Sequence, residues 1–380
     1  MDWRLTEEQS ILKKAARDFI SDRKFTEYAR EMEDDELGYA PQVWKEIAEL
    51  GWLGIIFPER YGGSEMNFLD LAILLEEMGR GCFPGPFVST VILGGMPIME
   101  SGTEEQKRAY LPMIARGEAI FTLALTERSG SYDARSIEVT AGDEGNAYVI
   151  NGTKLFVPDA HAADYMICAA RTGDRPPLEN GITLFIVDAK SPDISITPLK
   201  TIARNKLCEV MFDGLMVPKE NILGGVNEGW KVVQKIIEWA SVAKCCEMLG
   251  GMRRVLDLTV GHTKIREQFG ALIGTFQAIQ HHCANMLVDL DCSMTITYEA
   301  AWRLSQGLPC TKEAAMAKAF VSKAYNRVVT LGTQVHGGTG IIDVHDMTLY
   351  FRRAKSAELA FGDARYHRKT VAQRLGFRIK

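Results

Sequence analysis

The sequence has no long uncharged apolar run, and no stretch approaches the roughly 20 residues that a membrane-spanning helix needs. Basic residues are not in excess either, since 44 Lys and Arg stand against 49 Asp and Glu and give a formal net charge of −5. A nucleic-acid-binding protein would favour a basic face, so this class is disfavoured. The N-terminus lacks the apolar core of a signal peptide, and we expect a cytoplasmic protein without a membrane span.

Motifs for metals, disulfides and dinucleotides are also missing. The eight cysteines are scattered without a Cys-x-x-Cys motif, and the one close pair, Cys245–Cys246, is poorly placed for a disulfide. We therefore expect reduced thiols. Histidines such as His281–His282 lack the spacing of metal ligands, so no metal site is predicted. Gly338-Thr-Gly340 has neither the third glycine nor the preceding strand of a Rossmann motif.

The N-terminal part of the chain, residues 1–117, has the periodicity of helices. Thr6 can cap a first helix with Gln9 reaching back to it. Further helices are expected at Phe68–Met78 and Glu104–Arg116. With 380 residues, 46% hydrophobic and 24% charged, the chain is long enough for two or three domains of a soluble globular protein. We expect residues 1–117 to form an N-terminal α-helical domain.

Short β-prone runs separated by Gly, Asp, Asn and Pro follow in residues 118–224. The runs are Phe121–Thr126, Tyr148–Ile150, Lys154–Val157, Tyr165–Ala170, Thr183–Val187 and Glu209–Phe212. Turn signals are expected at Gly142–Asn146 and at Asn151–Gly152. Regular short strands with such turns predict a middle domain built as an antiparallel β-barrel or sandwich.

The helical period returns in residues 225–380 and persists to the end of the chain. Four long runs without a strand signal are Val232–Arg266, Phe276–Leu304, Lys312–Thr330 and Asp346–Ala360. Helices of this length usually pack side by side. The predicted fold class is therefore α+β, with an N-terminal helical domain, a middle antiparallel β-domain and a C-terminal helix bundle.

Five groups of motifs follow one another along the chain in a familiar order. They are Leu5-Thr-Glu-Glu-Gln9; Gly51-Trp-Leu-Gly-Ile55 with Gly62-Gly63; Leu125-Thr-Glu127 with Gly130-Ser131 and Asn151-Gly-Thr-Lys154; Arg266-Glu-Gln-Phe-Gly270 with Gln277 and Gln280; and Gln334-Val-His-Gly-Gly338. Together they resemble the acyl-CoA dehydrogenases over essentially the whole chain. The resemblance implies FAD, an acyl-CoA substrate, tetrameric assembly as a dimer of dimers, and electron-transferring flavoprotein as the electron acceptor.

In this family the flavin lies between two subunits, and the resemblance assigns cofactor contacts to two sets of residues. The set that reaches across to the neighbouring subunit would be Arg266, Phe269, Gln277, Gln334, Gly337 and Gly338. The set that serves the chain's own flavin would be Thr126, Ser131 and Phe156. The chemistry suits these roles, because an arginine fork binds pyrophosphate bidentately and glycines allow close backbone approach.

The chain departs from the family pattern where its own flavin and substrate would bind. Pro158 stands where relatives carry a threonine whose hydroxyl faces the flavin, and proline offers neither a hydroxyl nor an N–H. Arg128 replaces a loop proline, and this loop is one residue shorter than usual. Ser241 occupies the position of an arginine that contacts CoA in relatives.

The catalytic base is missing at both positions known in the family. Forming an α,β-double bond requires a carboxylate that removes the α-proton while a hydride leaves for the flavin. The usual glutamate position is Phe361, and the rarer alternative is Ala240. Neither side chain accepts a proton, so no catalytic residue is assigned. Asp363, two residues beyond Phe361, is the remaining candidate for a relocated base.

Three hypotheses follow. In the first, the chain is the non-base subunit of a heteromeric acyl-CoA dehydrogenase and completes the flavin site of a homologous partner. Relatives of that kind act on bulky or alicyclic acyl-CoAs, such as steroid side-chain thioesters in lipid degradation. In the second, it is a homotetrameric flavoenzyme that uses Asp363 or base-free chemistry on a CoA thioester. In the third, it is a flavin-free scaffold of the same fold.

Overall fold

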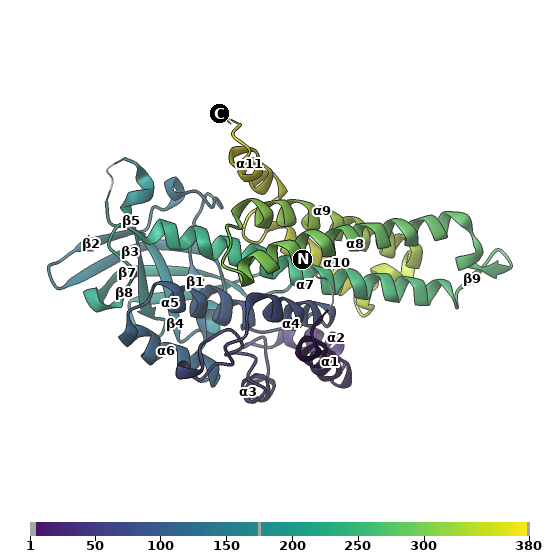
Figure 1. Cartoon of the computed structure of the whole chain (residues 1–380), viewed down its shortest axis with the longest axis horizontal. Helices are drawn as coiled ribbons and strands as arrows, with labels where there is room; N and C mark the ends of the chain where they lie inside the picture. The colour runs from purple at the N-terminus through teal and green to yellow at the C-terminus, as the bar shows by residue number, and fades with distance from the viewer. Residues whose placement is uncertain (1–4, 174–175, 378–380) are drawn as a thin grey trace. The chain divides into compact units, whose positions relative to one another are not determined.

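A computed structural model describes residues 5–173 and 176–377 of the chain. Along the chain, helices are followed by strands and then by helices, which confirms the predicted fold class (Figure 1). The chain divides into two compact units. The helical unit comprises Met1–Glu31, Asn67–Phe83 and Ser241–Lys380, and the β-containing unit comprises Met32–Met66 and Pro84–Ala240.

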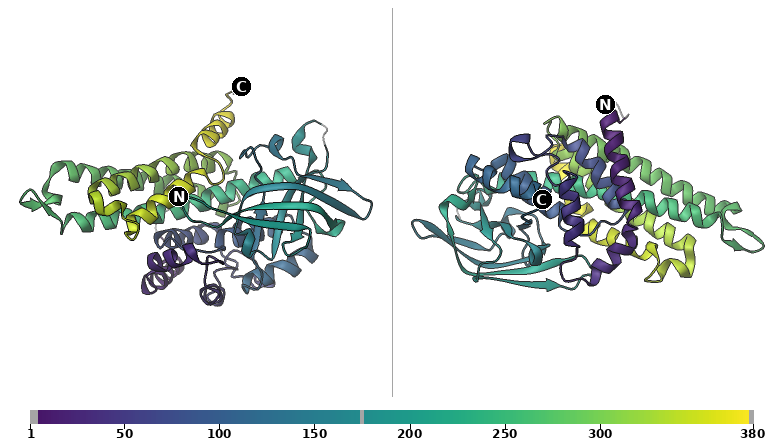
Figure 2. Two further views of the ribbon diagram at one scale, coloured as in Figure 1. Left: turned by 180° about the vertical axis from the view of Figure 1, so that it is seen from behind. Right: turned by 90° about the horizontal axis from the view of Figure 1, so that it is seen from below.

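Long antiparallel helices build the helical unit. Its helices are α1 (Glu7–Asp22), the start of α2 (Phe25–Asp34), α4 (Phe68–Arg80), most of α7 (Gly229–Thr263), α8 (Gln277–Ser305), α9 (Thr311–His336), α10 (Asp346–Leu359) and α11 (Ala364–Arg374). α7, α8 and α9 run side by side in every view, and α9 also packs against α10 and α11 (Figures 1 and 2). The predicted cap of α1 is confirmed, since Thr6 Oγ1 accepts from Gln9 N at 3.2 Å.

Glycines and a buried ionic network fasten α4 to its neighbours. A Cβ at Gly79 would meet Glu247 O at 2.0 Å, and one at Gly250 would meet Glu76 O at 1.8 Å, so α4 and α7 touch through their backbones. Glu76 is buried and accepts from Tyr298 Oη at 2.6 Å and from Lys13 Nζ at 3.2 Å. One carboxylate thereby joins α1, α4 and α8.

A mostly antiparallel sheet forms the centre of the β-containing unit. Its strands are β1 (Phe121–Ala124), β2 (Thr140–Asp143), β3 (Ala147–Pro158), β4 (Tyr165–Arg171), β5 (Ile182–Asp188), β6 (Ile194–Leu199), β7 (Leu207–Pro218) and β8 (Ile222–Leu223). They lie in the order β6-β7-β3-β2-β4-β5-β8, and β1 pairs with β4 in parallel. The helices of this unit are α3 (Pro41–Glu49), the π-helical segment Val88–Gly95, α5 (Met96–Ser101) and α6 (Glu104–Ala115).

Two local predictions were wrong. Asn151–Gly152 was expected to be a turn, but it lies inside the continuous strand β3, where the register against β7 shifts between Ile150 and Gly152. Gly152 has φ 130°, so the turn-forming residues make a bulge instead. The helix expected to reach Arg266 ends at Thr263, and a short hairpin of β9 (Glu267–Gln268) and β10 (Ala271–Leu272) follows. No helix among the described residues is long and apolar enough to cross a membrane.

Candidate functional site

The β9–β10 hairpin presents an aromatic ring to the outside of the helical unit. Phe269 and Gly270 form its two-residue turn, and both have positive φ, at 55° and 79°. A left-handed conformation costs an aromatic residue about 1–2 kcal/mol. The Phe269 ring contacts Phe276 at 6.2 Å between centroids, yet its side chain is 95% exposed. Contacts within the chain thus do not compensate for the strain, which suits a ring that packs on an external ligand.

Two polar side chains flank this hairpin. Arg266 lies directly before β9 and Gln277 is the first residue of α8, and both are exposed. The Arg266 guanidinium has no ion pair with any described residue. Its five N–H donors are therefore available to an anion such as a pyrophosphate.

The predicted glycine turn lies at the end of α9. Gln334, Gly337 and Gly338 are exposed, and Gly337 has φ 61°. A Cβ at Gly338 would meet no atom of the chain within 4 Å, and its φ is not in the left-handed region. Neither backbone conformation nor internal packing therefore requires a glycine at position 338, whereas close approach of a ligand would.

The ends of α7 and α9 lie next to each other, which brings these residues together. The rings of His262 on α7 and His336 on α9 stack with centroids 4.4 Å apart. We call Arg266, Phe269, Gln277, Gln334, Gly337 and Gly338 the C-terminal cofactor set. Two separate sequence motifs thus converge on one end of the helical unit.

In the β-containing unit, the predicted cofactor residues are partly engaged with the backbone. Thr126 Oγ1 donates to Leu155 O at 2.5 Å, and Ser131 Oγ accepts from Asp133 N at 3.1 Å. Phe156 stands at a bulge of β3, with φ 58° and a side chain that is 51% exposed. The bulge turns this ring out of the sheet, while the two hydroxyl groups fix the loop and strand around it.

Two residues of the family motifs, Glu127 and Lys154, form a buried ion pair that stabilises this region. Lys154 is fully buried, and its Nζ donates to Glu127 Oε1 at 2.6 Å and to Leu125 O at 3.1 Å. Glu127 also accepts from Glu138 N at 2.8 Å. The pair therefore ties the loop after β1 to β3. Pro158 closes β3, and its carbonyl accepts from Thr122 Oγ1 at 2.5 Å.

The loop that carries Phe361 is held by a buried lysine. Phe361 has φ 57° and Gly362 has φ 98°. Lys318 on α9 is fully buried and donates to the carbonyls of Ala357, Glu358 and Gly362, each at 3.0 Å. Burial lowers the pKa of Lys318 to about 8. A cation at the last carbonyls of α10 is a favourable C-terminal cap.

His367 fixes the same loop from the other side. This side chain is 3% exposed, and its Nε2 donates to Phe361 O at 2.9 Å. Burial and the nearby Lys318 lower the pKa of His367 to about 4. The loop backbone is therefore firmly held although its residue 361 is apolar. Sequence reasoning missed both residues; the available signal for Lys318 was a lone cation among alanines in an apolar helix face.

The remaining predicted positions lack a free catalytic group. Asp363 Oδ1 accepts from Tyr366 N at 2.8 Å and caps α11. Ala240 is fully buried. Ser241 is 1% exposed, and its hydroxyl oxygen has no partner in the part of the chain that the structure describes.

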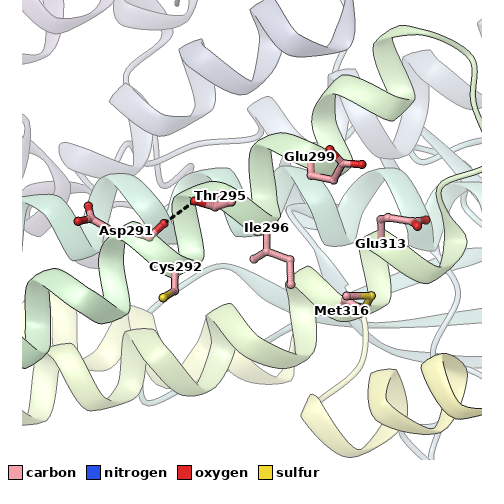
Figure 3. A pocket seen from close by; sticks show the side chains of 7 residues that line it. All are labelled: Asp291, Cys292, Thr295, Ile296, Glu299, Glu313 and Met316. Atoms are coloured by element: carbon pink, nitrogen blue, oxygen red, sulfur yellow. Dashed lines mark hydrogen bonds between the residues drawn. The ribbon is translucent and has the colours of Figure 1, made fainter. Parts of the chain in front are cut away.

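A surface groove of about 550 Å³ lies between α8 and α9, and none of its lining residues is a predicted site residue (Figure 3). It is lined by Asp291, Cys292, Thr295, Ile296, Glu299, Glu313 and Met316. Cys292 and Ile296 point from α8 toward α9. The groove contains carboxylates but no basic side chain that could bind a pyrophosphate.

Comparison with known proteins identifies the family. The chain matches the N-terminal, middle and C-terminal domains of acyl-CoA dehydrogenases over residues 6–118, 122–215 and 227–376. The chain belongs to the acyl-CoA dehydrogenase family. Members of this family are oxidoreductases that act on acyl-CoA and use FAD.

Individual relatives match along nearly their full length. A probable acyl-CoA dehydrogenase, YngJ of Bacillus subtilis, is 32% identical, covering 99% of this chain and 100% of the relative. The caffeyl-CoA reductase-Etf complex subunit CarC of Acetobacterium woodii is also 32% identical, over 97% and 98%. Butyryl-CoA dehydrogenase from Megasphaera elsdenii has TM-score 0.92, 28% identity and coverage of 99% and 100%. A structure named Tcur3481-Tcur3483 steroid ACAD has TM-score 0.87, 28% identity and coverage of 97% and 98%.

Proposed function

We propose that this chain is the base-lacking subunit of a heteromeric acyl-CoA dehydrogenase. In this role it completes the FAD site of a homologous partner, and the partner supplies the carboxylate that removes the α-proton. When bound, FAD accepts the hydride from the β-carbon. The residues of this chain would bind and orient the flavin, with Arg266 on the pyrophosphate and the backbone at Gly337 and Gly338 close to the adenosine half.

An asymmetry between the two sets of residues carries the proposal. Phe269 and Gly338 have features that contacts inside the chain do not account for, and Arg266 lacks an ion pair among the described residues. The positions that would serve the chain's own flavin and substrate have lost their polar groups. Phe361 cannot take a proton, and Pro158 offers neither a hydroxyl nor an N–H. A subunit that keeps only the residues for its neighbour's flavin can still contribute to the flavin site of another subunit.

The spacing along α9 supports a division between two subunits. His336 and the glycine turn mark the C-terminal end of α9, whereas Lys318, which holds the Phe361 loop, lies 18 residues earlier. At 1.5 Å per residue the two points are about 27 Å apart. The C-terminal cofactor set therefore lies far from the position of the missing base within one helical unit.

The proposed substrate is a large acyl-CoA, with an alicyclic or steroid acyl group as the leading candidate. The structure named Tcur3481-Tcur3483 steroid ACAD has the same fold over 97% of this chain. Electron-transferring flavoprotein is the proposed acceptor, and the relative from Acetobacterium woodii is by its name part of an Etf complex. The domain boundaries near residues 117 and 224 belong to the same proposal.

A homomeric enzyme with Asp363 as its base is the second candidate. One oxygen of Asp363 caps α11, and a carboxylate in this role is poorly placed to take a proton from a substrate. The capping contact thus favours the heteromeric assignment.

Replacement of Arg266 tests the proposed role. In the complex of this chain with its base-carrying partner, Arg266→Met should weaken FAD binding roughly 10- to 100-fold, because a charge-assisted contact is lost. Lys264→Met is the matched control, since it removes an exposed positive charge two residues away. Equal FAD affinity in the wild type and the Arg266 variant would contradict the proposal. A complex that contains no flavin would favour a scaffold.

A further inference from the structure

Three histidines from three segments meet directly behind the glycine turn. The rings of His262 and His336 are stacked at 4.4 Å, and the ring of His345 stands edge-on to His336 at 5.1 Å. His262 lies in the last turn of α7, His336 ends α9, and His345 precedes α10. The two helices that flank the 3-10 segment Gly337–Ile341, and the end of α7, thus each contribute one imidazole.

Hydrogen bonds define the neutral form of two of these rings. His336 Nδ1 lies 2.8 Å from Gly332 O and therefore donates its proton to that carbonyl. His345 Nδ1 accepts from Met347 N at 3.1 Å, so this nitrogen carries no proton and caps α10. Protonation of His345 would remove that acceptor and with it the cap.

The surroundings favour uncharged rings. Burial, with Arg266 and His345 as neighbours, lowers the pKa of His262. Burial, with His262 and His345, lowers the pKa of His336 against the opposing effect of the Gly332 carbonyl. Arg266 and the three imidazoles are the titratable groups that act on these two rings, and no carboxylate among the described residues does so. A proton added to His262 or His336 therefore has no carboxylate beside it, whereas His345 is adjacent in sequence to Asp346.

We propose that His262, His336 and His345 form a histidine latch that positions the glycine turn for the flavin at neutral pH and releases it on acidification. On proton uptake, like charges in contact separate the ends of α7 and α9, and α10 loses its first-turn cap. The segment from Gly337 to His345 then opens. The link to flavin rests on the proposed function, whereas the opening of the turn does not.

Hydrogen–deuterium exchange of peptides covering residues 337–345 tests the latch in the full-length chain. After correction for intrinsic exchange, protection should fall at least about tenfold between about pH 7.5 and about pH 5.5 in the wild type. His336→Gln with His345→Asn should strongly weaken this pH dependence, because only His262 of the three histidines remains. Glutamine can still donate to Gly332 O, and asparagine is a good cap that does not titrate. His281→Gln, an exposed histidine outside the latch, should behave as the wild type.

The latch would be contradicted if acidification left the protection of this segment unchanged in the wild type. It would also be contradicted if the double variant lost as much protection as the wild type. FAD release from the complex gives a second readout and should follow the same pH dependence as exchange. A pH dependence of flavin release that differs from that of exchange would contradict the latch. A pH-dependent turn in a complex that never carries flavin keeps the latch and rejects the proposed function.

Discussion

Three phenylalanines with left-handed backbone conformations mark the places where chemistry was expected. Phe156, Phe269 and Phe361 have φ of 58°, 55° and 57°. Bulky residues rarely adopt this region, and such strain collects at functional sites. Motifs predicted the positions, but no local sequence signal predicted the strain, because it arises at a bulge, a tight turn and a loop held by distant residues.

The Phe269→Asn variant separates the backbone strain at this position from its proposed role in flavin binding. Asparagine tolerates the left-handed turn that Phe269 adopts, so the variant should be more stable by about 1 kcal/mol. The same variant should lose flavin from the complex, because the exposed ring is removed. Urea unfolding and flavin content report the two effects. A variant that is more stable and still holds flavin normally would remove Phe269 from the cofactor set.

Asp363 offers a test that distinguishes a base from a cap. Asp363→Asn should keep both the stability and the activity of the complex, since asparagine caps as well as aspartate. Asp363→Ala should lose about 1 kcal/mol of stability without a specific loss of turnover. Unfolding midpoints and acyl-CoA oxidation rates decide the matter. Loss of turnover in the asparagine variant would establish the relocated base.

At the scale of elements, the loop after α10 depends on partners that sequence reasoning did not find. Lys318 reaches Gly362 across 44 residues of sequence. Local periodicity predicted α9 and α10, because each helix carries its own apolar pattern, although α9 continues past the expected end at Thr330 to His336. A cation that caps a neighbouring helix has no such pattern, and neither does the β9–β10 hairpin.

His367 should make the Phe361 loop sensitive to acid. Its folded pKa of about 4 lies below the ordinary value of 6.5, so its stabilising contribution is complete above pH 6.5 and is lost as pH falls toward 4. The full loss amounts to about 3 kcal/mol. Urea midpoints measured across this range should show a slope in the wild type that His367→Gln reduces. Identical slopes would show that His367 does not titrate as described.

The ionic network of α4 should matter far more than surface pairs. Glu76→Gln should destabilise the protein by about 3 kcal/mol, since it breaks a buried pair with Lys13 and Arg253. Burial raises the pKa of Glu76, but Lys13, Tyr298 and Arg253 outweigh it and the pKa is lowered. The contribution is therefore present above pH 4.5 and lost below it. Glu49→Gln, in an exposed pair, is the control and should have no measurable effect on the denaturant midpoint.

At the scale of the whole molecule, the sequence predicted the order of helices and strands but not their grouping. α1 and α4 join the C-terminal helices in one unit because Glu76 and Gly79 contact α7 and α8, more than 150 residues away. Such contacts between distant segments produce no pattern in the local sequence. The turn expected at Asn151–Gly152 failed for a related reason, since pairing with β7 extends β3 through it.

The central claim is that this chain helps to hold FAD but relies on a partner for the base. Flavin content and acyl-CoA oxidation should be measured for the chain alone, for the partner alone and for the two together. We predict substoichiometric flavin and no oxidation for the chain alone, and both flavin and oxidation for the complex. One FAD per chain with oxidation of acyl-CoA by this chain alone would contradict the account.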